Sequence, residues 1–177
     1  MADFTNRMIR AAKLDVSLYE EVEADKTAMG QAMMVVILSG IAAGVGNISR
    51  GGVMGIIWGT ILALVGWYVW AFLTYFIGAK LLPEPETKAN HQELLRTIGF
   101  SSSPGILRVL GIIPGLGSFL VFVASVWMLI AMIIAVKQAL DYSSTWRAVG
   151  VCIIGWIIQM IFVWLLVAIF GGAQAQL

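Results

Sequence analysis

Long apolar stretches separated by short polar segments run along most of this chain, as expected of a protein that crosses a membrane several times. A helix rises about 1.5 Å per residue, so roughly 20 mostly apolar residues cross the hydrocarbon core of a bilayer. Stretches of this length lie at residues 29–48, 53–79, 118–136 and 148–170. The pattern predicts an all-α fold, a polytopic transmembrane helical bundle over residues 28–177.

A further apolar stretch, at residues 99–114, is shorter and interrupted. Pro104 and Pro114 are helix breakers, and Arg108 lies in the middle. An arginine at the centre of a span costs about 2.5–3.5 kcal/mol on membrane-insertion scales. Three structures fit such a segment: a short fifth span, a re-entrant hairpin, and a helix lying at the interface.

The distribution of basic residues favours the first of these structures. If the segment spans and the N-terminus is inside, the inner side holds Arg7, Arg10, Lys13, Lys26, Lys80, Lys88, Arg96, Lys137 and Arg147. Arg50 is then outside. If the segment does not span, Lys137 and Arg147 move outside and the bias weakens. The positive-inside rule therefore predicts about five spans, with a cytoplasmic N-terminus and the C-terminus outside.

Residues 1–27 precede the first span and are predicted to form an amphipathic helical segment on the cytoplasmic surface. Phe4 and Met8 share one helix face, and Leu18 and Val22 repeat this spacing. Such a segment either packs on the bundle as a solvated helix or presents a surface on which a partner docks. Both interpretations remain open.

Charges along this N-terminal segment are sorted by sign. Basic residues come first and acidic residues follow: Arg7, Arg10 and Lys13, then Glu20, Glu21, Glu23 and Asp25. We expect the basic part to lie near anionic lipid headgroups and the acidic part to face water or a partner protein. Ser17 and Glu20 fit a capping box, which predicts that a second helix begins there.

Composition agrees with a membrane location and narrows the class of protein. Of the 177 residues, 60% are hydrophobic and 12% are charged, and the net charge is +1. These values argue against a soluble enzyme, a disordered chain and a nucleic-acid-binding protein. The chain has one cysteine, Cys152, and one histidine, His91. They exclude an internal disulfide framework and a metal site built from several cysteines or histidines.

The predicted spans lack the groups that catalysis needs. All ten acidic residues fall at residues 3–25, 84–93 and 141, outside the apolar stretches. No histidine or lysine lies within a span to activate a serine, and coupled transporters generally keep a carboxylate or histidine in the membrane. We therefore expect no catalytic residue, no metal ligand and no cofactor, and a protein that is not an enzyme.

Small residues recur at the spacing used for close helix packing. One GxxxG pair is formed by Gly40 and Gly44, and a tandem pair by Gly51, Gly55 and Gly59. These glycines serve packing within one chain or a homo-oligomer face. Arg108 either binds a lipid phosphate or anionic partner, or bonds to backbone carbonyls and reaches the interface.

Four runs of residues, in this order along the chain, carry a family resemblance. They are RAAKLDVSLYEEVEAD at residues 10–25, RTIGFSSSPGIL at 96–107, IIPGLG at 112–117 and AVKQAL at 135–140. Together they resemble bacterial members of the Yip (Ypt/Rab-interacting protein) domain family. The resemblance implies about five helices with a cytoplasmic N-terminus, in the bacterial inner membrane.

Eukaryotic relatives in that family bind small GTPases and act in vesicle trafficking. Their Asp-Leu-Tyr-Gly-Pro motif is not present here, because Leu18 and Tyr19 are followed by Glu20 and Glu21. The resemblance therefore does not carry GTPase binding over to this chain.

These observations lead to a working hypothesis of a non-catalytic scaffold or accessory subunit in the membrane. Its partners would be the lipid bilayer and another membrane protein or a second copy of the chain. The expected interaction surface comprises Leu18, Tyr19, Glu20, Arg96, Gly99, Phe100, Pro104 and Arg108. The alternative is a transporter or channel for a small or lipidic solute, with its site at the broken segment around Pro104, Arg108 and Pro114. An intramembrane enzyme is the least favoured hypothesis.

Overall fold

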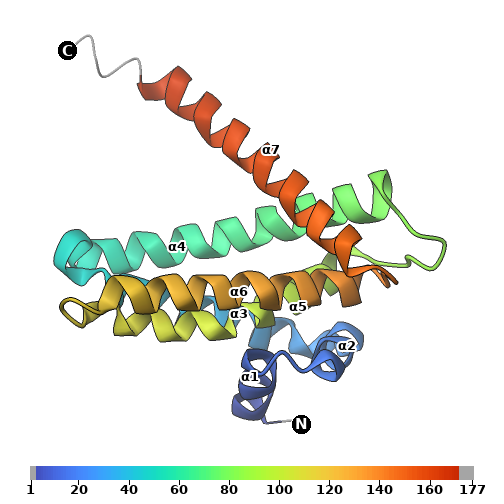
Figure 1. The fold of residues 1–177 in the computed structure, drawn as a ribbon, viewed down its shortest axis with the longest axis horizontal. Coiled ribbons are helices and arrows are strands. Elements are labelled where there is room, and N and C mark those ends of the chain that lie inside the picture. Colours follow the sequence, from blue (N-terminus) through green and yellow to red (C-terminus); the bar gives the residue numbers. More distant parts are fainter. Residues whose placement is uncertain (1–2, 172–177) are drawn as a thin grey trace.

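In the computed structural model, residues 3–171 are described and form an all-helical bundle, as the hydropathy pattern predicts (Figure 1). Its elements are α1 (Phe4–Ala12), α2 (Val16–Ala24), η1 (Lys26–Ala28), α3 (Met29–Gly46), α4 (Ile48–Tyr75), η2 (Phe76–Leu81), α5 (His91–Ser101), η3 (Ser103–Ile112), α6 (Gly117–Ala139) and α7 (Thr145–Gly171). Of these, η1 and η3 are 3₁₀ helices and η2 is a π-helical turn.

Helices α3 and α4, the pair α5 and η3, and helix α6 run between the two ends of the bundle, and α7 starts at one of these ends and slants away from the others (Figure 1). At one end, which we call the charged end, are the connections 82–90 and 140–144, and α1 and α2 pack against one side of the bundle, with α2 nearer to that end (Figure 1). At the opposite end, the far end, are the turn between α3 and α4 and the turn 113–116. Because α5 begins at the charged end and α6 begins at the far end, α5 and η3 together traverse the bundle. A re-entrant hairpin or an interfacial helix would not connect the two ends in this way.

Helix length and hydropathy agree with about five spans. Within the described residues, the stretches long and apolar enough to cross a membrane are Lys26–Gly46, Ile48–Leu81 and Gly117–Ala139, and Thr145–Ile161 is a shorter apolar helix. The remaining crossing combines α5 with the 10 residues of η3. A 3₁₀ helix rises about 2.0 Å per residue, so η3 adds about 20 Å to the roughly 16 Å of α5. The combined length is sufficient for the hydrocarbon core.

The broken crossing begins earlier than residue 99, the start predicted from sequence. Asn90 and Glu93 form a capping box in which the Asn90 side chain accepts from the Glu93 backbone N–H at 3.1 Å. The helix then continues through Gly99 to Ser101. Pro104 lies in the first turn of η3, so the serine- and proline-rich run marks a break inside the crossing rather than its beginning.

The N-terminal helices also begin differently from the prediction. The N-cap of α2 is Asp15, whose carboxylate accepts from the backbone N–H of Ser17 at 3.0 Å. The expected capping box of Ser17 and Glu20 is therefore wrong. Leu14 connects α1 to α2 with φ of 62°, which turns the chain sharply enough for the two short helices to pack against each other.

Apolar residues of α1 and α2 share one core with the long helices. Leu18, Tyr19 and Val22 are fully buried against residues of α3, α5 and α6, among them Ala32, Val35, Phe100 and Ala135. A second core cluster joins α4, α5, α6 and α7. The outward faces of α4 and α6 remain apolar and exposed, as expected for surfaces in contact with lipid.

The two glycine motifs differ in their packing. A Cβ added to Gly44 would lie 2.7 Å from the Cα of Ile56, and one added to Gly40 would lie 3.1 Å from the Cα of Thr60, so this pair brings α3 close to α4. A Cβ added to Gly51, Gly55 or Gly59 would meet nothing within 4 Å. The tandem motif therefore does not serve packing within the chain.

Candidate functional site: the acidic recess

Ion pairs hold the N-terminal helices α1 and α2 to each other, and one hydrogen bond joins them to α3. Arg7 is buried and donates from Nε to Glu21 Oε1 at 2.9 Å and from Nη2 to Asp25 Oδ2 at 2.8 Å. Its Nη1 donates to Gln31 Oε1 of α3 at 3.0 Å. Hydrogen bonds from Thr27 and from Arg7 lower the pKa of Asp25 to about 2.

These pairs contradict one expectation from sequence. Arg10 donates from Nε to Asp15 at 2.8 Å and also pairs with Glu21. The basic residues Arg7 and Arg10 therefore neutralise acidic residues of the same segment instead of lying free beside lipid headgroups. The basic and the acidic residues of this segment are separate along the sequence, and the turn at Leu14 brings them together in space.

Arg96 fixes α2 from the opposite side. Its guanidinium donates from Nε to the carbonyl of Val22 at 2.9 Å and from Nη2 to the carbonyl of Glu23. These carbonyls belong to the last turn of α2, where no helical N–H remains to bond them. A cation there also complements the negative end of the helix dipole, so Arg96 caps α2 electrostatically as well as geometrically.

Most of the interaction surface expected from sequence is buried, and in that respect the prediction is wrong. The residues inside the fold are Leu18, Tyr19, Arg96, Gly99, Phe100 and Pro104. Leu18, Tyr19 and Val22 form the inward face of α2, and Gly99 allows α5 to contact Ala32 of α3. Residues that a chain shares with its family can therefore be shared because they pack the core, as they do here, and not only because they bind a partner.

Glu20 and Arg108 are the two expected residues with polar groups in accessible places. Glu20 is exposed and accepts from the Gln138 amide of α6 at 3.0 Å. Arg108 is half-buried and donates from Nη2 to the Ser39 hydroxyl at 2.8 Å and to the Ser39 carbonyl at 3.1 Å. The two residues belong to different cavities.

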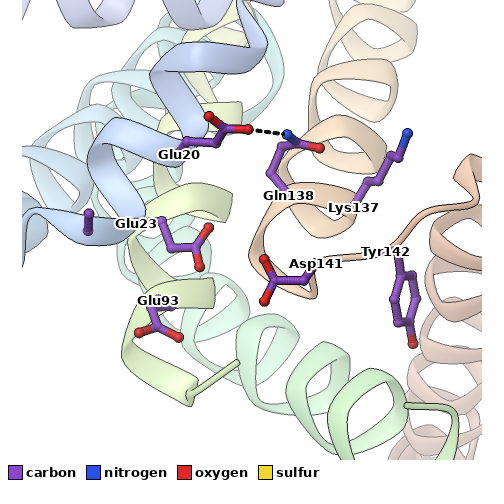
Figure 2. A pocket seen from close by; sticks show the side chains of 8 residues that line it. Glu20, Glu23, Glu93, Lys137, Gln138, Asp141 and Tyr142 are labelled. Atoms are coloured by element: carbon purple, nitrogen blue, oxygen red, sulfur yellow. Dashed lines mark hydrogen bonds between the residues drawn. The ribbon is translucent and has the colours of Figure 1, made fainter. Parts of the chain in front are cut away.

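An acidic recess of about 550 Å³ opens at the charged end between α2, α5 and α6 (Figure 2). Its lining residues are Glu20, Glu23, Ala24, Glu93, Lys137, Gln138, Asp141 and Tyr142. The carboxylates of Glu23, Glu93 and Asp141 face one shared space in Figure 2. Four carboxylates against one ammonium leave the recess negative at neutral pH.

Glu23 is the most perturbed acid of the recess. Burial, followed by the negative charges of Asp141 and Glu93, raises its pKa to about 7, and the opposing charge of Arg96 offsets this only in part. Glu23 thus gains and loses a proton near neutral pH. A cation placed in the recess would favour its charged form.

The carboxylates of the recess are not arranged as a metal centre. Among the residues that the structure describes, no three side chains of His, Cys, Asp or Glu are placed to hold one ion.

Sequence reasoning did not identify this recess, although one signal was present. Its acids come from residues 20–23, 93 and 141, which are the three acidic regions of the chain. Five spans place all three regions at the same end of the bundle. Only the packing of α2 against α5 and α6 then brings the individual carboxylates together.

Comparison with known proteins gives a family. No curated protein and no protein of solved structure matches the chain. The model of the Yip1 domain matches residues 19–167, a region that contains the five crossing segments up to residue 167 and all residues of the acidic recess. Because this match covers most of the chain and follows the helical organisation described above, the chain belongs to the Yip1 domain family.

Proposed function

We propose that this integral membrane protein is a non-catalytic scaffold or accessory subunit, whose acidic recess receives a basic segment of another membrane protein. The observation that carries the proposal is the convergence of Glu20, Glu23, Glu93 and Asp141 on one open space. Lysine and arginine side chains are the natural partners of such a surface, since carboxylates pair with both.

Rigidity of the recess supports a docking role. Arg96 and Arg7 fix α2, and the capping box of Asn90 and Glu93 fixes the beginning of α5. A surface whose side chains are already held in place loses little conformational freedom on binding. The recess can therefore recognise a partner without rearranging its backbone.

We propose that the chain lies in a bacterial inner membrane. Its charged end is then in the cytoplasm, and its C-terminus is outside. Basic residues concentrate at that end, including Lys80, Lys88 and Arg147. The positive-inside rule assigns such an end to the cytoplasm. The partner segment would then be a cytoplasmic loop or tail rich in lysine or arginine.

A non-catalytic role agrees with the state of the hydroxyl groups in the spans. The Ser39 hydroxyl bonds to the Arg108 guanidinium, and the Ser101 and Ser125 hydroxyls donate to carbonyls of their own helices. None of these three hydroxyls contacts a histidine, lysine or carboxylate that could accept its proton.

Neutralising the recess tests the proposal. The full chain would carry Glu20→Gln, Glu23→Gln and Asp141→Asn together, and the matched control would carry Glu86→Gln in the exposed connection 82–90. Proteins retained after crosslinking in native membranes would be identified and then bound again as purified components. We expect at least one partner with a basic segment to be lost from the triple variant, to be retained by the control, and to dissociate at high salt. An unchanged partner set in the triple variant would overturn the proposal.

A further inference from the structure

A second cavity, of about 530 Å³, lies within the membrane-spanning part of the bundle. Its walls are formed by residues of α3, α4, α5, η3 and α6, and by Gln159 of α7. The polar side chains that line it are Ser39, Ser101, Ser102, Arg108, Ser125 and Gln159. We call it the Arg108 cavity. Its volume is in the range of pockets that hold small molecules.

The Arg108 guanidinium lies deep in the bundle. Its partner Ser39 comes ten residues after Met29, the first residue of α3, which places it about 15 Å along that helix. Ser125 and Leu129 of α6 line the same cavity and are exposed on the outer surface of the bundle. The cavity therefore opens sideways, at the depth of the bilayer, where lipid rather than water is the neighbouring medium.

The positive charge of Arg108 has no opposing charge beside it among the described residues of the cavity. Arg108 donates from Nε to the Gly105 carbonyl at 3.1 Å and from Nη2 to Ser39, and all of these acceptors are neutral. Within residues 3–171, no carboxylate lines the cavity. In the part of the chain that the structure describes, Nη1 bonds to no acceptor, so its N–H groups are available to a ligand.

A second unused donor lines the same cavity. The indole nitrogen of Trp70 is buried and has no hydrogen-bond partner. The neighbouring Trp67, by contrast, donates its N–H to the Leu95 carbonyl at 2.9 Å. A buried N–H without an acceptor is costly, and the Arg108 guanidinium, which bonds only neutral acceptors, has no opposing charge beside it.

The geometry points to an anionic membrane lipid as the ligand of the Arg108 cavity, held through its phosphate by Arg108. Phosphate oxygens accept hydrogen bonds from a guanidinium with charge assistance, which matches the unused Nη1 donors. Val36, Met128 and Met132 supply apolar wall for the parts of the lipid beside its headgroup. The sideways opening gives a membrane lipid direct access to the cavity.

Tryptophan fluorescence can measure this binding, because Trp67 and Trp70 line the cavity. The purified full chain in detergent would be titrated with brominated phosphatidylglycerol, whose bromine atoms quench nearby indoles. Parallel titrations would use brominated phosphatidylcholine, and unbrominated phosphatidylglycerol or inorganic phosphate as competitors. The variants would be Arg108→Gln, Arg108→Lys and the control Arg50→Gln, an exposed arginine of the far end.

We expect phosphatidylglycerol to bind at least about tenfold more tightly than phosphatidylcholine, and Arg108→Gln to lose about that factor. Arg108→Lys should keep part of the affinity, because it retains the charge and loses the guanidinium donors, and Arg50→Gln should keep nearly all of it. Equal affinity for the two lipids, or unchanged affinity in Arg108→Gln, would overturn the inference. If inorganic phosphate displaced the brominated lipid as readily as unbrominated phosphatidylglycerol does, the ligand would be a free anion and the proposal of a lipid would be overturned. If Arg108→Gln does not fold, the comparison of the two lipids on the unaltered chain decides alone.

Discussion

At the scale of single residues, polar side chains stabilise this fold mainly by bonding carbonyls that helices leave unpaired. Arg96 bonds the last turn of α2, and Trp127 donates to the Ala12 carbonyl at the end of α1 at 2.8 Å. Tyr142 donates to the Gly78 and Leu82 carbonyls in and after the π-helical turn. Each of these donors lies on a different element from its acceptor, so each bond also fixes the position of one element on another.

Replacement of Arg96 by alanine is predicted to destabilise the protein by about 2–3 kcal/mol, because the Val22 and Glu23 carbonyls lose a charged donor in a buried site. Arg96→Lys should recover part of the loss, since an ammonium reaches fewer acceptors in this geometry. Thermal unfolding in detergent, followed by circular dichroism, measures the change. Arg50→Ala is the control and should change stability little; an equal loss in both variants would contradict this role of Arg96.

Glu23 should make stability depend on pH in a defined direction. Its pKa is about 7 in the folded protein and 4.5 as the reference value, so the folded state holds its proton more tightly than the unfolded chain. This contribution to stability is complete below about pH 4.5 and is lost as the pH rises through 7.

Glu23→Gln is therefore expected to raise stability at pH 8 by about 1 kcal/mol, a discounted value because water reaches the recess, and to change it little at pH 5. Unfolding temperatures of both proteins measured across this interval test the prediction. Glu86→Gln serves as the control, and a variant with the same pH profile as the unaltered protein would refute the assignment.

At the scale of helices, features that depend on local sequence could be predicted, whereas features that depend on contacts between distant segments could not. Hydropathy located both ends of α3 and of α6 to within three residues, because lipid selects apolar length directly. The beginning of α5 at His91 depends on a local cap at Asn90. By contrast, the burial of Tyr19 and the position of Arg108 depend on which helices become neighbours, and one sequence does not contain that information in its periodicity.

The two glycine motifs give a matched pair of substitutions at this scale. Gly44→Ala places a methyl group against the Cα of Ile56 and is predicted to cost about 1–3 kcal/mol by separating α3 from α4. Gly55→Ala meets open space and should be neutral or slightly stabilising, since alanine favours the helix by about 1 kcal/mol. Unfolding temperatures compare them. If Gly55→Ala destabilised the protein without changing its oligomeric state, the tandem motif would also serve close packing within the chain, and the assignment of such packing to Gly40 and Gly44 alone would be wrong.

At the scale of the whole molecule, α1 and α2 are part of the bundle rather than an appendage of it. Tyr19 and Val22 are packed between α3 and α5, and Arg7 reaches Gln31. Removing residues 1–25 would therefore open a buried core in addition to removing charge. For this reason single substitutions in the recess are better tests of docking than truncation of the N-terminus.

The transmembrane topology can be tested with single cysteines in a Cys152→Ala background. Thr87→Cys lies in the connection at the charged end, and Ser118→Cys lies exposed at the far end. With five spans and a cytoplasmic N-terminus, an impermeant maleimide added to intact cells should label Ser118→Cys and leave Thr87→Cys unlabelled until the membrane is opened. The reverse labelling would invert the topology, and labelling of both cysteines or of neither from outside would contradict the fifth crossing.

The 3₁₀ geometry of η3 has a consequence for how this family can tolerate changes in length. With about three residues per turn, side chains three apart fall in one straight row, and Gly105, Arg108 and Gly111 form such a row toward α3. One residue inserted between Gly105 and Arg108 would rotate the guanidinium by about 120°, away from Ser39. Three inserted residues would restore its direction but shift it about 6 Å along the axis. Homologous chains that keep the arginine in register with its serine should therefore vary in length on either side of this short segment, but not within it.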